Sequence, residues 1–173
     1  MAVYGMKPIE IESVSAVTAT PSTDLGTTRF YGGNKYQYMY NAGAEAYTGA
    51  PVWVTGATDY NFVSTYATFA ALTAAGADGF AFAGVVQNAT CAASSYCWIA
   101  QSGLLNCRPQ SSAIAVGDMV LAADDGNFVM SRTGVTNTAT TEELASYIAN
   151  TVIGVAQEVA TAAATGTIAV WRR

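Results

Sequence analysis

The chain has 173 residues, of which 51% are hydrophobic and only 11% are charged, and its formal net charge is −5. This apolar content is sufficient for the core of one domain, while the charged fraction is well below the roughly 25% of an ordinary soluble domain. The negative balance argues against direct nucleic-acid binding, because such binding depends on Lys and Arg at phosphates.

Residues 1–24 are predicted to form an extended arm. The apolar residues show no helical period, and Pro8 and Pro21 favour extended or edge conformations because proline fixes φ and lacks an N–H donor. We favour an arm that lies on a neighbouring subunit or a partner. The alternative is that the segment forms the first edge strand of the domain itself. The candidate contact residues are Val3, Tyr4, Met6, Ile9, Ile11 and Val14.

Residues 27–41 are predicted to form a β-hairpin, in which two strands flank a Gly-Gly-Asn turn at residues 32–34. On the second strand, Tyr36, Tyr38 and Tyr40 share one face at a period of two. A tyrosine ladder can stack sugars or bases. We favour the commoner arrangement, a half-buried strand face with hydroxyl groups at its rim.

The rest of the chain is predicted to form short strands separated by Gly and Asp turns, a pattern typical of a small antiparallel barrel or sandwich. Residues 65–76 fit a short helix or a strand equally well. The final strand reaches the terminus, so we expect Trp171 to anchor the chain end in the core. The predicted strands are residues 51–55, 59–64, 79–86, 96–102, 117–121, 127–131, 152–156 and 166–171.

One short helix is predicted at residues 141–150, because Thr140 and Glu143 have the spacing of a capping box. The predicted fold is therefore mainly β: a small antiparallel barrel, or a β-tulip or sandwich, with one short helix and an extended N-terminal arm. Residues 25–173 are expected to form a single β-rich domain, with a helix-containing insertion at about residues 132–150.

The three cysteines are Cys91, Cys97 and Cys107. Their number is odd, and no signal peptide is visible at the start of the chain, so synthesis in the cytoplasm and free thiols are the default expectation. The alternative is a bridge between Cys91 and Cys97 across a loop, if the mature protein meets oxidising conditions.

No residue pattern predicts catalysis or a cofactor. The sequence contains no histidine, so a nucleophilic triad would need Lys or a carboxylate as its base, and neither Lys7 nor Lys35 lies in a suitable motif. The cysteine spacing fits no zinc site, and no segment is apolar enough over a sufficient length to span a membrane. We therefore expect a binding or structural protein that is not an enzyme and has no metal or cofactor.

Several short segments resemble the capsid cement proteins, or head decoration proteins, of tailed bacteriophages. The resemblance covers about residues 79–171, and an upstream hairpin at residues 25–40 is similar to one found in some phage relatives. The residues that carry it are Gly79-Phe-Ala-Phe-Ala-Gly-Val-Val86, Tyr96-Cys-Trp-Ile-Ala-Gln-Ser-Gly103, Val116-Gly-Asp-Met-Val-Leu121, Val152-Ile-Gly-Val-Ala156 and Gly166-Thr-Ile-Ala-Val170.

The resemblance implies a structural virion protein, made in the host cytoplasm, that binds the outer surface of an icosahedral phage head. Its partners would be the major capsid protein and other copies of itself, with a homotrimer favoured over a dimer. The weak surface charge fits this expectation, because charge normally keeps molecules apart. The alternatives are a pilus-like structural subunit, or a carbohydrate-binding virion adhesin that uses Tyr36, Tyr38, Tyr40 or Trp53.

Overall fold

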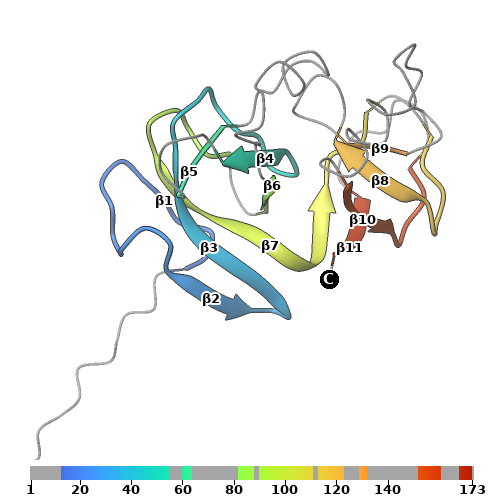
Figure 1. Cartoon of the computed structure of the whole chain (residues 1–173), viewed down its shortest axis with the longest axis horizontal. Coiled ribbons are helices and arrows are strands. Elements are labelled where there is room, and N and C mark those ends of the chain that lie inside the picture. The colour runs from blue at the N-terminus through green and yellow to red at the C-terminus, as the bar shows by residue number, and fades with distance from the viewer. Residues whose placement is uncertain are drawn as a thin grey trace, which may run out of the picture.

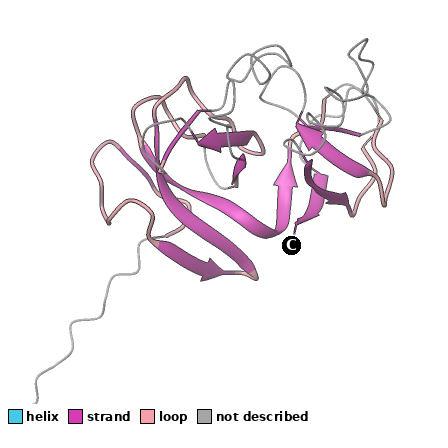
Figure 2. Cartoon of the chain, in the orientation of Figure 1, coloured by secondary structure: helices cyan, strands magenta, loops and turns pink. Residues whose placement is uncertain are grey.

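The computed structural model describes residues 13–54, 60–63, 82–87, 90–110, 113–122, 129–131, 152–160 and 168–172. Within these ranges the chain forms strands, turns and loops but no helix (Figure 1 and Figure 2). The prediction of a mainly β fold is confirmed, whereas the predicted helix and residues 65–76 lie outside the described residues. The strands are β1 (Val17–Thr18), β2 (Thr28–Tyr31), β3 (Asn34–Asn41), β4 (Pro51–Val54), β5 (Asn61–Val63), β6 (Phe82–Val86), β7 (Tyr96–Cys107), β8 (Met119–Ala122), β9 (Val129–Ser131), β10 (Val152–Ala156) and β11 (Ile168–Arg172).

Five strands close into a β-barrel, in the order β3-β5-β4-β6-β7 and back to β3. The β3–β5 pair is parallel and the other four pairs are antiparallel. Strands β1 and β2 lie outside this ring, where β1 pairs with β7 and β2 pairs with β3. Closure leaves the five barrel strands without a free edge.

A second sheet continues from the barrel because β7 is long enough to belong to both (Figure 1). Its order is β7-β11-β10-β8-β9. The last strand, β9, bonds to residues 108–110, which directly follow β7. The N–H of Val129 donates to the carbonyl of Arg108 at 2.8 Å, and the N–H of Gln110 donates to the carbonyl of Val129 at 2.7 Å. These two bonds make the second sheet a small ring as well.

The predicted hairpin is confirmed as β2 and β3, which pair in register on either side of Gly32 and Gly33. Both glycines have positive φ, at 57° and 84°. This is the conformation that a two-residue turn needs if it is to match the twist of the flanking strands. The local Gly-Gly signal therefore fixes the register of the hairpin.

Within the barrel, strands β3 and β7 are covered on both faces, by two separate hydrophobic clusters. The first cluster contains Tyr38 and Trp98 from the barrel strands and continues to Leu105, Ile153 and Val170 of the second sheet. It therefore joins the barrel and the second sheet into one packed unit. The second cluster is formed by side chains of the barrel strands and of the segments next to the disulfide. Its members are Met39, Ala46, Val52, Phe62, Ala83, Val86, Cys91, Cys97 and Ile99.

The tyrosines of β3 are structural, in agreement with the favoured interpretation. Tyr36 is 5% exposed, Tyr38 is fully buried, and the half-buried Tyr40 packs against Tyr96 with ring centroids 4.9 Å apart. The Tyr38 hydroxyl lies 3.0 Å from the Thr18 hydroxyl. The ladder therefore holds the first described residues of the chain against the barrel and does not offer a free stacking surface.

The part of the predicted arm that the structure describes lies on the chain's own domain. Strand β1 pairs with β7 through Val17 and Thr18, and Val14 is 8% exposed and belongs to the first cluster. Residues 13–24 thus follow the edge-strand alternative. Residues 1–12 lie outside the described residues.

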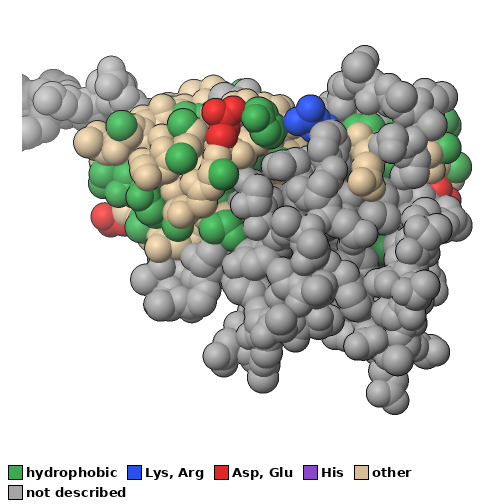
Figure 3. Space-filling view, turned by 90° about the horizontal axis from the view of Figure 1, so that it is seen from above, with side chains coloured by type: hydrophobic (Ala, Val, Ile, Leu, Met, Phe, Trp, Pro, Cys, Tyr) green, Lys and Arg blue, Asp and Glu red, His purple; other side chains and the backbone are tan. Residues whose placement is uncertain are grey.

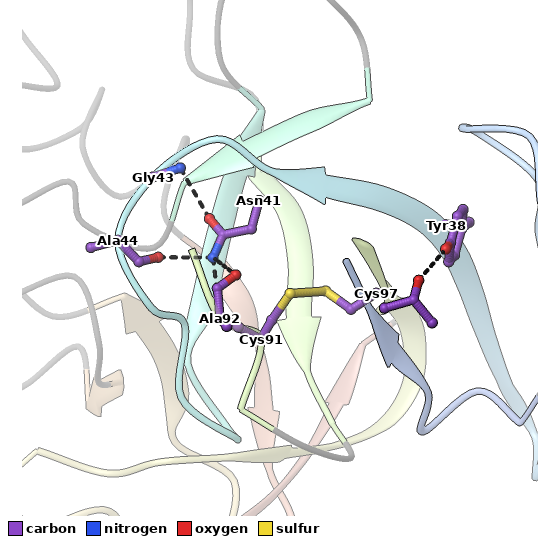
Figure 4. Close-up of a disulfide and its surroundings, with 8 residues drawn as sticks. Tyr38, Asn41, Gly43, Ala44, Cys91, Ala92 and Cys97 are labelled. Atoms are coloured by element: carbon purple, nitrogen blue, oxygen red, sulfur yellow. Dashed lines mark hydrogen bonds between the residues drawn. A yellow bond between two sulfur atoms is a disulfide. The ribbon is translucent and has the colours of Figure 1, made fainter. Parts of the chain in front are cut away.

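The prediction of free thiols is wrong for Cys91 and Cys97, which form a disulfide (Figure 4). Their Cα atoms lie 6.4 Å apart because a tight turn folds Cys91 back beside β7. The buried Asn41 side chain holds this turn: its amide nitrogen lies 3.0 Å from the carbonyl oxygens of both Cys91 and Ala92. The third cysteine, Cys107, is free and buried, as predicted.

Candidate interaction surface

An apolar stripe crosses three neighbouring strands of the second sheet. Leu104 of β7 pairs with Trp171 of β11, and Trp171 pairs with Val155 of β10. Directly paired residues of antiparallel strands have their side chains on the same face. The three side chains are 46%, 47% and 42% exposed, respectively. Leu104, Trp171 and Val155 therefore form a continuous exposed row, which we call the apolar stripe.

A β-bulge in β7 turns Leu104 outward. The pairing of β3 with β7 shifts by one residue at Gln101, and such an extra residue reverses the alternation of side chains beyond it. Trp98 before the bulge and Leu105 after it consequently pack in the same cluster, although an odd number of positions separates them. Leu104 is left on the opposite, exposed face.

A second irregularity positions Val155. The β8–β10 register shifts between Val152 and Gly154, so that Ile153 is buried and Val155 is exposed. The backbone of β11 comes close at this point, and a Cβ atom on Gly154 would collide with the carbonyl oxygen of Trp171. Glycine is therefore required next to the stripe.

A groove of about 600 Å³ lies beside the apolar stripe, along β10 and β11. It opens to solvent, and Val155 and Trp171 belong both to the groove and to the stripe. Its lining is mostly apolar or backbone, with one amide and one guanidinium as polar groups. The lining residues are Val152, Ile153, Gly154, Val155, Gln157, Trp171 and Arg172.

Arg172 ties the groove to the barrel. Its guanidinium donates to the carbonyls of Val152 at 2.8 Å and Ile153 at 3.1 Å. It also lies 4.2 Å above the ring centroid of Phe82, which belongs to barrel strand β6. One side chain therefore connects β11, β10 and β6 through two charge-assisted hydrogen bonds and a cation–π contact.

The titratable groups at this junction are shifted mainly by burial. Burial raises the pKa of the Cys107 thiol well above its ordinary value of 9.0, while the nearby charge of Arg172 acts in the opposite direction. Burial lowers the pKa of Arg172, and Cys107 opposes that shift. The thiol is therefore held in its neutral form inside the core, where it is a packing group and a poor nucleophile.

Of the six contact residues that the sequence predicts in the N-terminal arm, the structure describes only Val14. Val14 is packed in the chain's own core and is not available to a partner in this state. Val3, Tyr4, Met6, Ile9 and Ile11 lie outside the described residues. Among the described residues, no three His, Cys, Asp or Glu side chains gather as a metal site would require.

The prediction that Trp171 anchors the chain end in the core is wrong. Trp171 is 47% exposed, and it is Val170 that is fully buried. The sequence contained a signal for this arrangement, because Ile168 and Val170 alternate with Ala169 and Trp171. In a strand with one buried face, successive side chains point to opposite faces, so Val170 and Trp171 do not both lie in the core.

Few charged side chains appear on the described surface. On the face shown in Figure 3, the described atoms are mainly hydrophobic side chains, uncharged polar groups and backbone, with isolated acidic and basic residues. This agrees with the charged fraction of 11%. A partner would meet little electrostatic steering on this face, so binding here would depend on shape and apolar contact.

The described residues define a mainly β protein with a closed barrel and an exposed apolar stripe. Comparison with known families found no family model that matches the chain, and no curated protein matches it. No helix within the described ranges has the length and hydropathy to cross a membrane.

Proposed function

We propose that this chain is a structural virion protein that binds the outer surface of an icosahedral phage head and stabilises contacts between major capsid subunits. Two independent lines support the proposal. The sequence resembles capsid cement proteins over about residues 79–171, and the structure exposes an apolar stripe on a weakly charged sheet.

The apolar stripe is the observation that carries the proposal. Leu104, Trp171 and Val155 are presented by three paired strands. Their backbone is therefore already ordered, and little conformational freedom remains to be lost on binding. Tryptophan is among the residues that most often dominate interface energies, and the adjacent groove gives a partner side chain a place to insert. A rigid apolar row of this kind suits docking onto a preformed protein surface.

If several copies of the chain bind together, a small contact area per copy is sufficient for stable attachment. Apolar burial yields about 25 cal/mol per Å² before association costs are subtracted, so one stripe alone binds weakly. Copies held together as an oligomer, with a homotrimer implied by the resemblance, avoid repeated association costs through a high effective concentration. Residues 1–12 add candidate contacts through Val3, Tyr4, Met6, Ile9 and Ile11.

The disulfide is consistent with a protein whose mature form is extracellular, where conditions are oxidising. The chain would be made in the host cytoplasm, where thiols are kept reduced. Cys91 and Cys97 would then be bridged when the released particle meets oxidising conditions. Bridging would occur after assembly and would tighten the barrel of the mature particle.

The glycan-binding alternative loses most of its candidate residues. Tyr36, Tyr38 and Trp53 are 5%, 0% and 1% exposed, and Tyr40 packs against Tyr96. Buried rings cannot stack on a sugar. No specific observation favours the pilus-like alternative.

The proposal is tested on virions of the phage whose genome encodes the chain. Mass spectrometry of purified particles should find the chain at a copy number comparable to that of the major capsid protein. Purified chain should also rebind, to saturation, to heads from which it has been stripped. Its absence from the virions would overturn the proposal.

A matched pair of variants tests the surface. Replacing Leu104, Val155 and Trp171 together with serine should abolish rebinding. The control replaces Val116 and Val159 with serine, because these side chains are 62% and 65% exposed but lie outside the stripe. Equal binding by both variants would show that the stripe is not the docking surface, and deletion of residues 2–12 would then test the N-terminal segment.

A further inference from the structure

We propose that two copies of this chain pair through strand β2, antiparallel to each other and about a two-fold axis at Phe30. The contact uses residues of strand β2, none of which belongs to the apolar stripe. It does not depend on the proposed function, because it is a property of the free protein in solution.

Strand β2 is an exposed edge with apolar side chains. Among the described strands it pairs only with β3. Phe30 and Tyr31 are 80% and 67% exposed, the two highest values among the large hydrophobic residues that the structure describes. Edges of this kind are templates for another strand unless charge or a covering segment protects them.

The backbone of β2 has hydrogen-bonding groups directed at a partner. Thr27 bonds to β3, because its carbonyl accepts from the N–H of Tyr38 at 2.9 Å. In an antiparallel pair, the residues that bond to a given neighbour alternate along the strand. Thr28 and Phe30 therefore direct their N–H and carbonyl groups away from β3, where a second β2 strand can bond to them.

Phe30 gives the most favourable register for a two-fold pair. An axis perpendicular to the sheet keeps each face of one hairpin continuous with the same face of the other. With the axis at Phe30, the two Phe30 side chains face each other, and Arg29 lies opposite the partner subunit's Tyr31. An axis at Arg29 would set two guanidinium groups against each other, which is unfavourable. An axis at Tyr31 would shorten the paired region.

The Arg29 side chain already lies on the face where this register needs it. Its guanidinium sits 4.5 Å above the ring centroid of Trp98, on the face that Arg29 shares with its cross-strand neighbour Tyr36. The partner subunit's Tyr31 would extend this row of aromatic and cationic groups. The sequence Arg-Phe-Tyr is thus self-complementary in this one register.

The pairing is weak in dilute solution because β2 spans only four residues, far less than a standard interface. It gives a dimer, the assembly that the resemblance ranks second to a trimer. Copies held close together on one surface would pair more completely, because their effective concentration is high.

Cysteine cross-linking tests the register in the full-length protein. Hydrogen-bonded antiparallel partners have Cα atoms about 5.5 Å apart, which lies within the range for a disulfide. Phe30→Cys should therefore give a covalent dimer on mild oxidation. Thr28→Cys is the matched control, since Thr28 faces the partner subunit's Gly32 and not its own copy. Equal cross-linking of both variants would overturn the register.

Analytical ultracentrifugation tests the association without cross-links. The wild-type sedimentation coefficient should rise towards that of a dimer as the protein concentration increases, and Phe30→Lys should remain monomeric with an unchanged thermal melting curve. A wild-type protein that stays monomeric throughout would overturn the proposal. So would a dimer that survives Phe30→Lys but is lost on deletion of residues 2–12, because the N-terminal segment would then be the occupant.

Discussion

The barrel and the second sheet bury their shared strand in different ways. In the barrel, β7 is covered on both faces, and its residue Cys97 forms the disulfide with Cys91. In the second sheet, β7 contributes Leu105 to the core but exposes Leu104, and the Arg172 side chain fastens the junction. The difference indicates a division of labour: the barrel supplies stability, and the second sheet presents a surface.

The sharpest test compares two tryptophans with opposite environments. Trp98→Ala should destabilise the protein by about 4 kcal/mol, because it leaves a large cavity in the first cluster. Trp171→Ala should change the free energy of unfolding by only about 1 kcal/mol, because its side chain is 47% exposed. Urea denaturation measures both, and equal losses would contradict the division of labour.

The next test removes the disulfide from the barrel. Replacing Cys91 and Cys97 with serine should lower the free energy of unfolding by about 2 kcal/mol, since the bridge closes only a short loop. Binding through the apolar stripe should be unchanged. Thermal melting of the wild type with and without reductant provides the control, because the variant should not respond to reductant.

A smaller effect is expected at the junction of the two regions. Arg172→Ala removes two hydrogen bonds to β10 and the contact with Phe82, and it should cost about 1.5 kcal/mol. Arg172→Lys keeps the charge but loses the planar group that lies over the Phe82 ring, so it should recover part of this loss. Hydrogen exchange should show β10 and β11 opening before the barrel in both variants; simultaneous opening would contradict the comparison.

The smallest effect is a dependence on alkaline pH. Burial raises the pKa of Cys107 above its ordinary value of 9.0, so the folded protein keeps the proton while the unfolded chain releases it. The stability that the neutral thiol contributes is fully present below pH 9 and is lost as the pH rises further, by about 1 kcal/mol at pH 10. Between pH 9 and pH 10, the free energy of unfolding should fall by that much less in Cys107→Ala than in the wild type, as measured by denaturation at several pH values.

Local patterns predicted much of the fold. The Gly-Gly turn located β2 and β3, period-two alternation located most of the other strands, and the tyrosines of β3 were recognised as structural. Each of these signals acts between residues that are close in sequence. The mainly β class followed from their number and spacing.

The disulfide, the bulge in β7 and the apolar stripe could not be predicted, because they depend on contacts between residues that are distant in the sequence. The pairing of Cys91 with Cys97 requires the turn that Asn41 holds from 50 residues away, and the expected compartment pointed to free thiols. The bulge at Gln101 reverses the alternation of β7, which exposes Leu104. The apolar stripe is assembled from three distant segments, so it became visible only in three dimensions.

The continuity of β7 also has a mechanical consequence. A load applied at Leu104 and directed along β7 passes through this one strand into the barrel. There it meets the hydrogen bonds to β3 and β6 in shear, so many of them must break together rather than one at a time. Such a molecule resists pulling better than one whose regions are joined by a flexible linker.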